Sequence, residues 1–235
     1  MITVVAPAKI NLFLRICGKI DAGYHLLDSV IVFTRFGDHL TIELAHDDQL
    51  AITGEFASEL DSADDNLVML ALRRFRAAGG VIRGLSITLE KNIPVGAGLG
   101  GGSADAAALL RAVNTLSTTP LGSAALNRLA AKLGADVPAC LAGVCQRIAG
   151  IGETITPVNL DFAGSILLVN PRIPLSTKDV FTRFTGSKSG FAGSLSHLDA
   201  AGKYKHMTKQ MLHAKTSVCR YASNISIIQH NYCKR

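Results

Sequence analysis

The sequence predicts an α+β fold, because strand and helix patterns mix along the chain without a regular βαβ alternation. The N-terminal part favours strands. A strand pair is expected within 2–17, broken at Pro7, and two more strands over 26–36 and 39–44, joined by a turn at Gly37-Asp38.

The middle of the chain predicts helices around one more strand. Apolar residues at helical spacing predict a helix over 67–78, and Asp64-Asp65-Asn66 supplies residues that can cap its start. The other expected elements are, in order, a strand over 85–90, a helix over 103–116, a helix from about Ser123 to Gly134, a helix from about Pro138, a hairpin of 144–148 and 153–158 around Gly150-Ile151-Gly152, a buried strand over 165–169 and a helix over 176–184.

Composition and charge restrict the class of protein. The 235 residues have ordinary apolar content, and no apolar run reaches the roughly 20 residues of a membrane helix. The net charge of +6 comes wholly from residues 193–235, since residues 1–192 hold 17 basic and 17 acidic residues. A basic stretch alone is a weak signal, so neither a nucleic-acid nor a membrane partner is expected. Five cysteines without zinc-ligand spacing, and Lys9 and Arg15 within the N-terminal apolar stretch, favour free thiols in a cytoplasmic protein.

The most informative segment is PVGAGLGGGSAD at 94–105, in which five of the seven residues 96–102 are glycine. The segment leads from a strand into an alanine-rich helix, so the first amides of that helix lack partners and attract phosphate together with the helix dipole. Glycine also lets the backbone approach a bulky anion. The segment fits neither the Walker pattern nor the dinucleotide fingerprint. A tight connection that binds nothing is the alternative.

Three further segments carry polar groups that could act with this loop. Lys9 and Asn11 lie in an apolar strand, Tyr24 and His25 lie in a loop, and Asp136 shortly precedes a proline that starts a helix. Lysine and aspartate are rarely buried without a partner, so a Lys9–Asp136 pair is expected. Such a pair suits a hydroxyl acceptor, because the carboxylate can take the proton while the ammonium keeps it ionised. A structural ion pair and a helix cap are the alternatives.

These motifs together resemble those of the GHMP kinase superfamily. The matching segments are PAKINLFLRI, GYHLLDSV, PVGAGLGGGSADAA and GADVPACL, in this order, and the resemblance covers roughly residues 1–190. It implies the GHMP kinase fold, with an N-terminal domain like domain 2 of ribosomal protein S5 and an incomplete ferredoxin-like C-terminal domain. The resemblance is strongest to the branch that uses ATP to phosphorylate the 2-hydroxyl of a cytidine diphosphate-linked methylerythritol in the non-mevalonate isoprenoid pathway.

The resemblance also implies roles at the phosphate end of the site. Asp136 is expected to be the base, with Lys9 as its partner beside the acceptor hydroxyl, and Ser103 is expected near a Mg²⁺ ion. The residues expected to bind ATP are Pro94, Val95, Gly96, Ala97, Gly98, Leu99, Gly100, Gly101, Gly102, Ser103 and Ala104.

The same resemblance implies contacts for the cytidine-linked substrate. Asn11 is expected to help hold this substrate. Tyr24 is expected to stack on the cytosine and His25 to hydrogen-bond to it, with Phe181 on the other face of the base. Taken singly, the two aromatic residues could be packing residues, and the histidine could be an ordinary loop residue.

The expected domains are a GHMP kinase N-terminal domain over 1–155, the start of a C-terminal domain over 156–192, and an atypical basic tail over 193–235. Members of the family usually have a third glycine motif, Gly-Ser-Gly, before a closing strand, and none follows Gly190 here. The charge changes at the same place. This predicts a replaced or frameshifted C-terminus, with poor solubility and reduced or absent activity.

Three other functions stay open at this point. The first is another superfamily kinase acting on homoserine or a mevalonate-type alcohol, which Tyr24-His25 disfavours. The second is a degenerate nucleotide-binding protein, for which ATP would bind without any acceptor being phosphorylated. The third is a basic nucleic-acid-binding protein, whose binding would be lost on deletion of 193–235.

Overall fold

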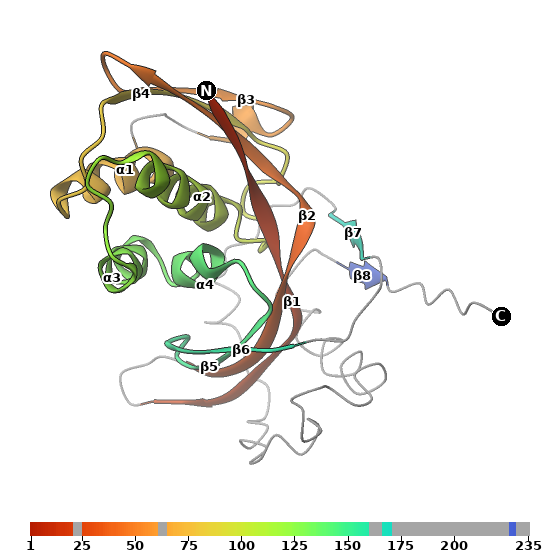
Figure 1. Cartoon of the computed structure of the whole chain (residues 1–235). Coiled ribbons are helices and arrows are strands. Elements are labelled where there is room, and N and C mark those ends of the chain that lie inside the picture. The colour runs from red at the N-terminus through yellow and green to blue at the C-terminus, as the bar shows by residue number, and fades with distance from the viewer. Residues whose placement is uncertain (21–24, 61–64, 160–165, 171–225, 229–235) are drawn as a thin grey trace. The chain divides into compact units, whose positions relative to one another are not determined.

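The computed structural model describes residues 1–20, 25–60, 65–159, 166–170 and 226–228. These residues belong to two compact units. The first unit comprises Met1–Ile10, Phe33–Val95 and Leu99–Val144, and the second comprises the described residues of Asn11–Val32, Gly96–Gly98 and Cys145–Arg235. Two long strands, β1 (Ile2–Lys19) and β2 (His25–Ala45), contribute to both units (Figure 1).

The first unit contains a sheet in which β3 (Gln49–Thr53) and β4 (Gly84–Glu90) join β2. β2 pairs antiparallel with β4, from His39↔Glu90 to Ala45↔Gly84, and β3 pairs with β4 in parallel. Leu85, Ile87 and Leu89 of β4 are buried, whereas the residues between them are not. The predicted strand at 85–90 is therefore confirmed, and it directs one face into the core.

The helices described in the first unit pack against one another: α1 (Leu67–Ala77), α2 (Gly101–Leu116), α3 (Ser123–Leu133) and α4 (Val137–Ala142) (Figure 1). A short 3₁₀ turn, η1 (Ala57–Glu59), precedes them. All four predicted helices in this part of the chain are confirmed. The Asn66 side chain caps α1 by accepting from the Val68 amide at 2.9 Å.

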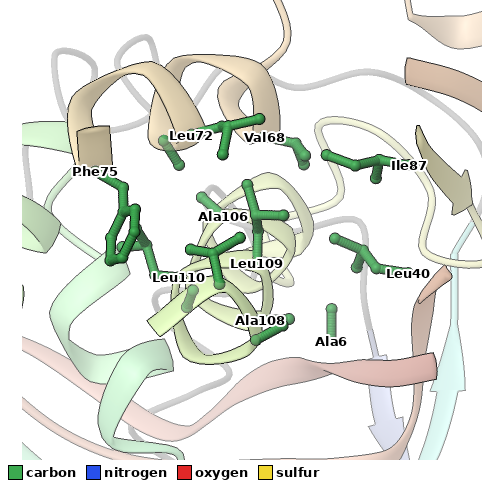
Figure 2. Packing of buried hydrophobic residues seen from close by; sticks show 14 of the residues in the cluster. Ala6, Leu40, Val68, Leu72, Phe75, Ile87, Ala106, Ala108, Leu109 and Leu110 are labelled. Atoms are coloured by element: carbon green, nitrogen blue, oxygen red, sulfur yellow. The ribbon is translucent and has the colours of Figure 1, made fainter. Parts of the chain in front are cut away.

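The core surrounds α2, whose buried residues are mostly alanine and leucine. Figure 2 shows Leu109 and Leu110 of α2 packed with Leu72 and Phe75 of α1, and with Ile87 of β4. Each fully buried large side chain contributes about 1.5 to 3 kcal/mol. Because α2 lies within this core, its first turn is held in a defined position.

The second unit contains the expected hairpin. β5 (Gln146–Gly150) pairs antiparallel with β2, from Leu27↔Gly150 to Ile31↔Gln146, and also with β6 (Thr154–Pro157). Gly150, the last residue of β5, and Gly152, in the turn that follows, both adopt positive φ. β7 (Leu167–Val169) pairs antiparallel with β8 (Ser226–Ile228), so three residues of the predicted basic tail form a strand.

Two predicted breaks in the N-terminal strands are wrong. β1 runs through Pro7 without interruption. Among the described strands it pairs only with β2, and an edge strand tolerates a residue without an N–H. β2 likewise runs through Gly37-Asp38 without a turn. A Cβ at Gly37 would lie 2.3 Å from the Ala6 carbonyl oxygen, so this glycine allows close approach of β1 and β2.

The prediction of a buried strand over 165–169 is also wrong in part. The strand begins at Leu167, and Leu167 and Val169 are 55% and 47% exposed. The helix expected over 176–184 lies outside the described residues, and the predicted domain boundaries near 155 and 192 stay predictions. Within the described residues, no helix is both long and apolar enough to cross a membrane.

Candidate active site

The first unit brings Lys9 of β1 and Asp136 together, as the sequence predicts. Lys9 Nζ lies 3.2 Å from Asp136 Oδ2. The lysine side chain is buried, with 7% exposed, whereas the aspartate side chain is 42% exposed. The carboxylate therefore has an open side that a hydroxyl group can reach.

Asp136 occupies the N-cap position of α4, but its side chain makes no capping hydrogen bond. The helix-cap alternative therefore does not account for this carboxylate. Arg111 of α2 holds the other end of α4, since its Nη1 donates to the Cys140 carbonyl at 2.7 Å and to the Leu141 carbonyl at 3.2 Å. These contacts fix α4, and with it Asp136, against α2.

The glycine loop passes directly over the stem of Lys9. The Lys9 amide donates to the carbonyl of the buried Leu99 at 2.8 Å. A Cβ at Gly100 would lie 3.2 Å from Lys9 Cε, and Gly100 has a φ of +68°. This position therefore requires glycine both for space and for its left-handed backbone. A Cβ at Gly134 would lie 4.0 Å from Ser103 Oγ, so the residues before α4 also meet the first turn of α2.

The glycines of the loop have different surroundings. A Cβ at Gly96, Gly98 or Gly102 would meet no atom within 4 Å in the described part of the chain. At Gly101, by contrast, a Cβ would lie 3.2 Å from Ile93 Cγ2 and 3.3 Å from Lys91 Nζ. The start of α2 thus packs closely against Ile93 and Lys91 at Gly101, whereas the backbone at Gly96, Gly98 and Gly102 is open on one side. Such a backbone suits an anion.

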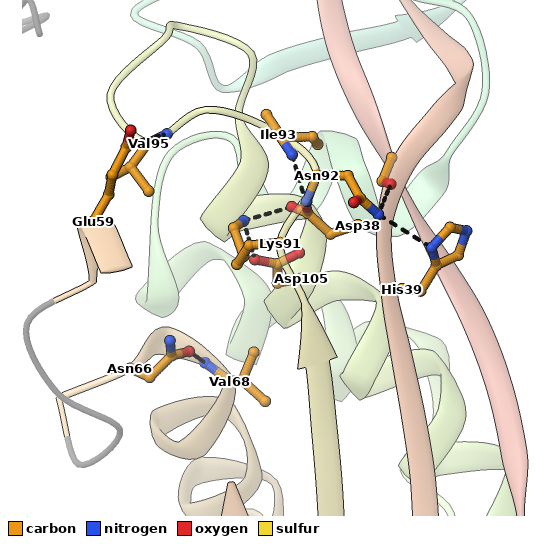
Figure 3. Close-up of polar contacts among 11 residues, drawn as sticks. Asp38, His39, Glu59, Asn66, Val68, Lys91, Asn92, Ile93, Val95 and Asp105 are labelled. Atoms are coloured by element: carbon orange, nitrogen blue, oxygen red, sulfur yellow. Dashed lines mark hydrogen bonds and ion pairs between the residues drawn. The ribbon is translucent and has the colours of Figure 1, made fainter. Parts of the chain in front are cut away.

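A second charged cluster lies next to the start of α2, and it was not predicted from the sequence. Lys91 Nζ donates to Asp38 Oδ2 at 2.5 Å and to Asp105 Oδ2 at 2.8 Å (Figure 3). Asp38 Oδ1 accepts from the amides of Asn92 at 2.6 Å and Ile93 at 2.8 Å. The three charged residues are at most 3% exposed. We call Lys91, Asp38 and Asp105 the buried ion triad.

The triad has unusual proton affinities. Burial raises the pKa of Asp105 to about 7, although Lys91 opposes this shift. Burial also disfavours the charge on Lys91, but the two carboxylates outweigh it and raise the pKa of the lysine. A carboxylate within the alanine run 104–112 was the signal that could have revealed this cluster. Asp38 was not recognised as a buried acceptor, because the sequence predicts a turn at Gly37-Asp38.

Three cysteines in the described residues, Cys17, Cys140 and Cys145, are free thiols, as expected, and Cys140 is buried. Burial raises the pKa of Cys140 to about 12, with the Asp136 charge adding to this shift. It also raises the pKa of Cys145 to about 11. The nucleophilic thiolate form is therefore scarce at neutral pH for these two residues.

Of the residues expected to contact a cytidine-linked substrate, Asn11 and His25 belong to the second unit. Asn11 Nδ2 donates to Ser29 Oγ at 2.7 Å, and Ser29 donates its own proton to the Phe13 carbonyl at 2.6 Å. This relay sets the orientation of the Asn11 amide. His25 is the first residue of β2. Tyr24 and Phe181 lie outside the described residues.

The fold and the glycine loop have counterparts in known proteins. Residues 66–144 match the GHMP kinases N terminal domain family. A crystal structure of a 4-(cytidine 5'-diphospho)-2C-methyl-D-erythritol kinase superposes with a TM-score of 0.65 and 34% identity, covering 77% of this chain and 63% of that one. The fold is therefore that of the GHMP kinases, which confirms the predicted fold class.

Curated relatives narrow this class. The 4-diphosphocytidyl-2-C-methyl-D-erythritol kinase of Paramagnetospirillum magneticum is 45% identical over 184 residues, covering 78% of this chain and 64% of the relative. The kinase of the same name from Parvibaculum lavamentivorans is 44% identical over 193 residues, covering 82% and 67%. The chain belongs to the 4-diphosphocytidyl-2-C-methyl-D-erythritol kinase family. It spans about two thirds of the length of these relatives.

Proposed function

We propose that the chain transfers the γ-phosphate of ATP to the 2-hydroxyl of 4-diphosphocytidyl-2-C-methyl-D-erythritol. The observation that carries the proposal is the Lys9–Asp136 pair at 3.2 Å, with Lys9 packed against the glycine loop. The first unit thus holds a proton acceptor next to Leu99 and Gly100, the residues that lead into α2. The names of the relatives supply the substrate.

On the acceptor side, Asp136 takes the proton of the attacking hydroxyl as the new oxygen–phosphorus bond forms. The bond between the γ-phosphorus and the bridging oxygen of ATP breaks, and ADP leaves. The exposed face of Asp136 leaves room for this hydroxyl, and the buried Lys9 ammonium holds the carboxylate in place at 3.2 Å. The same ammonium offsets negative charge on the phosphoryl group in the transition state of the transfer. Phosphoryl transfer depends mainly on positioning and charge stabilisation, so two ionised side chains can serve as the chemical groups.

On the donor side, residues 94–104 wrap the phosphate chain. The open glycines 96, 98 and 102 let oxygen atoms reach backbone amides. The first turn of α2 adds unpaired N–H groups and the positive end of the helix dipole. The buried Leu99 anchors the middle of this loop.

A Mg²⁺ ion fits this donor set. Among the described residues, no group of three His, Cys, Asp or Glu side chains could bind a metal alone. An ion that arrives with ATP needs few protein ligands, because phosphate oxygens and waters complete its octahedron. The Ser103 hydroxyl, a hard oxygen donor in the first turn of α2, would hold it. When bound, the ion neutralises charge on the phosphates.

On the substrate side, Asn11 and His25 hold the cytidine-linked part, with Tyr24 and Phe181 on the faces of the cytosine. The Ser29–Phe13 relay supports the role of Asn11, because it orients the amide before a substrate arrives. Fixed polar groups of this kind give specificity at little entropic cost.

The test is ATP consumption by the full chain with and without the cytidine diphosphate-linked substrate. Replacing Asp136 by asparagine removes the base and keeps its size, so we expect turnover to fall about 10²- to 10⁴-fold while ATP affinity is retained. Asp47→Asn, at a carboxylate that is 77% exposed, is the matched control and should leave turnover unchanged. Full turnover by the Asp136→Asn variant would refute the assignment. ATP binding by the unaltered chain without transfer to any acceptor would favour the degenerate nucleotide-binding alternative.

A further inference from the structure

The buried ion triad connects the two ends of the glycine loop. Lys91 lies three residues before Pro94, and Asp105 directly follows Ala104. Their ion pair at 2.8 Å therefore closes the chain segment 94–104 at its base. A loop whose ends are joined has fewer conformations to lose when it binds a ligand.

The start of the loop is held by backbone contacts as well. Asp38 accepts from Lys91 Nζ and from the amides of Asn92 and Ile93, so one carboxylate secures three consecutive residues at the exit of β4. The Val95 amide donates to Glu59 Oε2 at 3.1 Å (Figure 3). The strand exit is thereby tied to β2 and to η1.

The far end of the loop rests on the same cluster. A Cβ at Gly101 would lie 3.3 Å from Lys91 Nζ and 3.5 Å from Asp38 Oδ2, so the first turn of α2 sits on the triad. The charged contacts thus gather at the two ends of the loop. Between these ends, Gly96 and Gly98 keep an open side.

The triad is poorly explained as a source of stability. It buries two carboxylates with one ammonium, and the attraction within a buried ion cluster often fails to offset the loss of hydration. Asp105 Oδ1 is buried without a hydrogen-bond partner among the described residues, which adds to the cost. The cluster lowers stability, but it holds the ends of a binding loop, so positioning of this loop explains its presence better than stabilisation does.

We propose that Lys91 and Asp105 form a clasp that keeps the ends of the glycine loop at a fixed spacing and so preorganises the loop for the phosphate chain of a nucleotide. The choice of ligand rests on the proposed function. Lys91 and Asp105 are positioning residues, since they act through the backbone of residues 94–104.

The test compares Asp105→Asn and Asp105→Ala with Asp48→Asn, all in the full chain. Asp48 is also an ion-paired carboxylate of the first unit: it pairs with Arg76 and accepts from the Leu85 amide at 3.0 Å. Its replacement should lower thermal stability and leave the loop unaffected. Three properties are measured: thermal stability, ATP affinity by calorimetry, and amide hydrogen exchange of residues 96–102 without ligand.

The clasp predicts opposite patterns for the two sites. Asp105→Asn should weaken ATP binding about fivefold and Asp105→Ala about tenfold or more, with exchange in the loop faster by a similar factor. Neither variant should be less stable at pH 8 than the unaltered chain, because each removes a buried charge. Asp48→Asn should lose stability and keep its ATP affinity. A merely structural role cannot give this reversal.

Equal ATP affinity and equal loop exchange in the Asp105 variants and the unaltered chain would overturn the clasp. An equal loss of ATP affinity in Asp48→Asn would also overturn it, since the effect would then follow general stability. Failure of the unaltered chain to bind ATP would refute the proposed function instead. In that case the exchange comparison still decides whether Lys91 and Asp105 order the loop.

Discussion

Replacing Gly102 by alanine separates the part that the loop plays in folding from the part it plays in binding. Gly102 is the second residue of α2, and a Cβ there would meet no atom within 4 Å in the described part of the chain. Alanine is favoured over glycine in a helix by up to about 1 kcal/mol. We therefore expect the unfolding temperature to rise by about 2 to 4 °C.

The same methyl group would project from the helix turn whose amides are proposed to bind phosphate. A displacement of the phosphate chain by about 1 Å can cost a factor of about 100 in the reaction, so ATP affinity and turnover should fall roughly 10- to 100-fold. The assay is a thermal melt together with calorimetric titration of ATP.

Gly101→Ala is the matched control, because it makes the same chemical change one residue away. Its Cβ would lie 3.2 Å from Ile93 Cγ2 and 3.3 Å from Lys91 Nζ, and overpacking of this kind costs about 1 to 3 kcal/mol. It should lower the unfolding temperature where Gly102→Ala raises it. If Gly102→Ala binds ATP as tightly as the unaltered chain, the phosphates do not lie against this turn, and the assignment of the loop is wrong.

Two further predictions concern the first unit. Gly37→Ala would place a Cβ 2.3 Å from the Ala6 carbonyl oxygen, so β1 and β2 must separate. We expect the free energy of unfolding, measured in urea, to fall by about 3 kcal/mol. A change below about 0.5 kcal/mol would contradict the close approach of the two strands. Burial raises the pKa of Asp105 to about 7. Between about pH 4 and 7 the folded chain therefore binds more protons than the unfolded chain does. This group consequently lowers the free energy of unfolding as pH rises through that window. Asp105→Asn should therefore gain roughly 2 to 3 kcal/mol relative to the unaltered chain between pH 5 and 8, and parallel stability profiles for the two chains would refute the shift.

Much of the fold could be predicted from the sequence, because local patterns determine local structure. The alternation of β4 and the apolar spacing of α1 follow from which side chains must leave water. The Lys9–Asp136 pair could also be predicted, since two charges in apolar segments need partners. The resemblance of four motifs then indicated the family, which the relatives confirm.

The errors have a common physical cause. Pro7 and Gly37 have local propensities that break strands, but β1 is an edge strand and β2 needs a glycine where Ala6 approaches. Asp38 resembled a turn residue, yet it is the buried acceptor for Lys91 and two backbone amides. In each case the deciding neighbour is distant in the chain or lies on another element.

The sequence by itself predicted the helices, most of the strands and the pairing of Lys9 with Asp136, because these depend on residue type and spacing. The phosphate-binding role of residues 94–104 is also a prediction from residue type and spacing. Only the tertiary structure decided how the loop is held. Lys91 and Asp105 are 14 residues apart, and Asp38 is 53 residues before Lys91, so only the packing of β2, β4 and α2 brings their charges together. Ion pairing acts over a few ångströms of space, and the sequence pattern alone does not specify that distance.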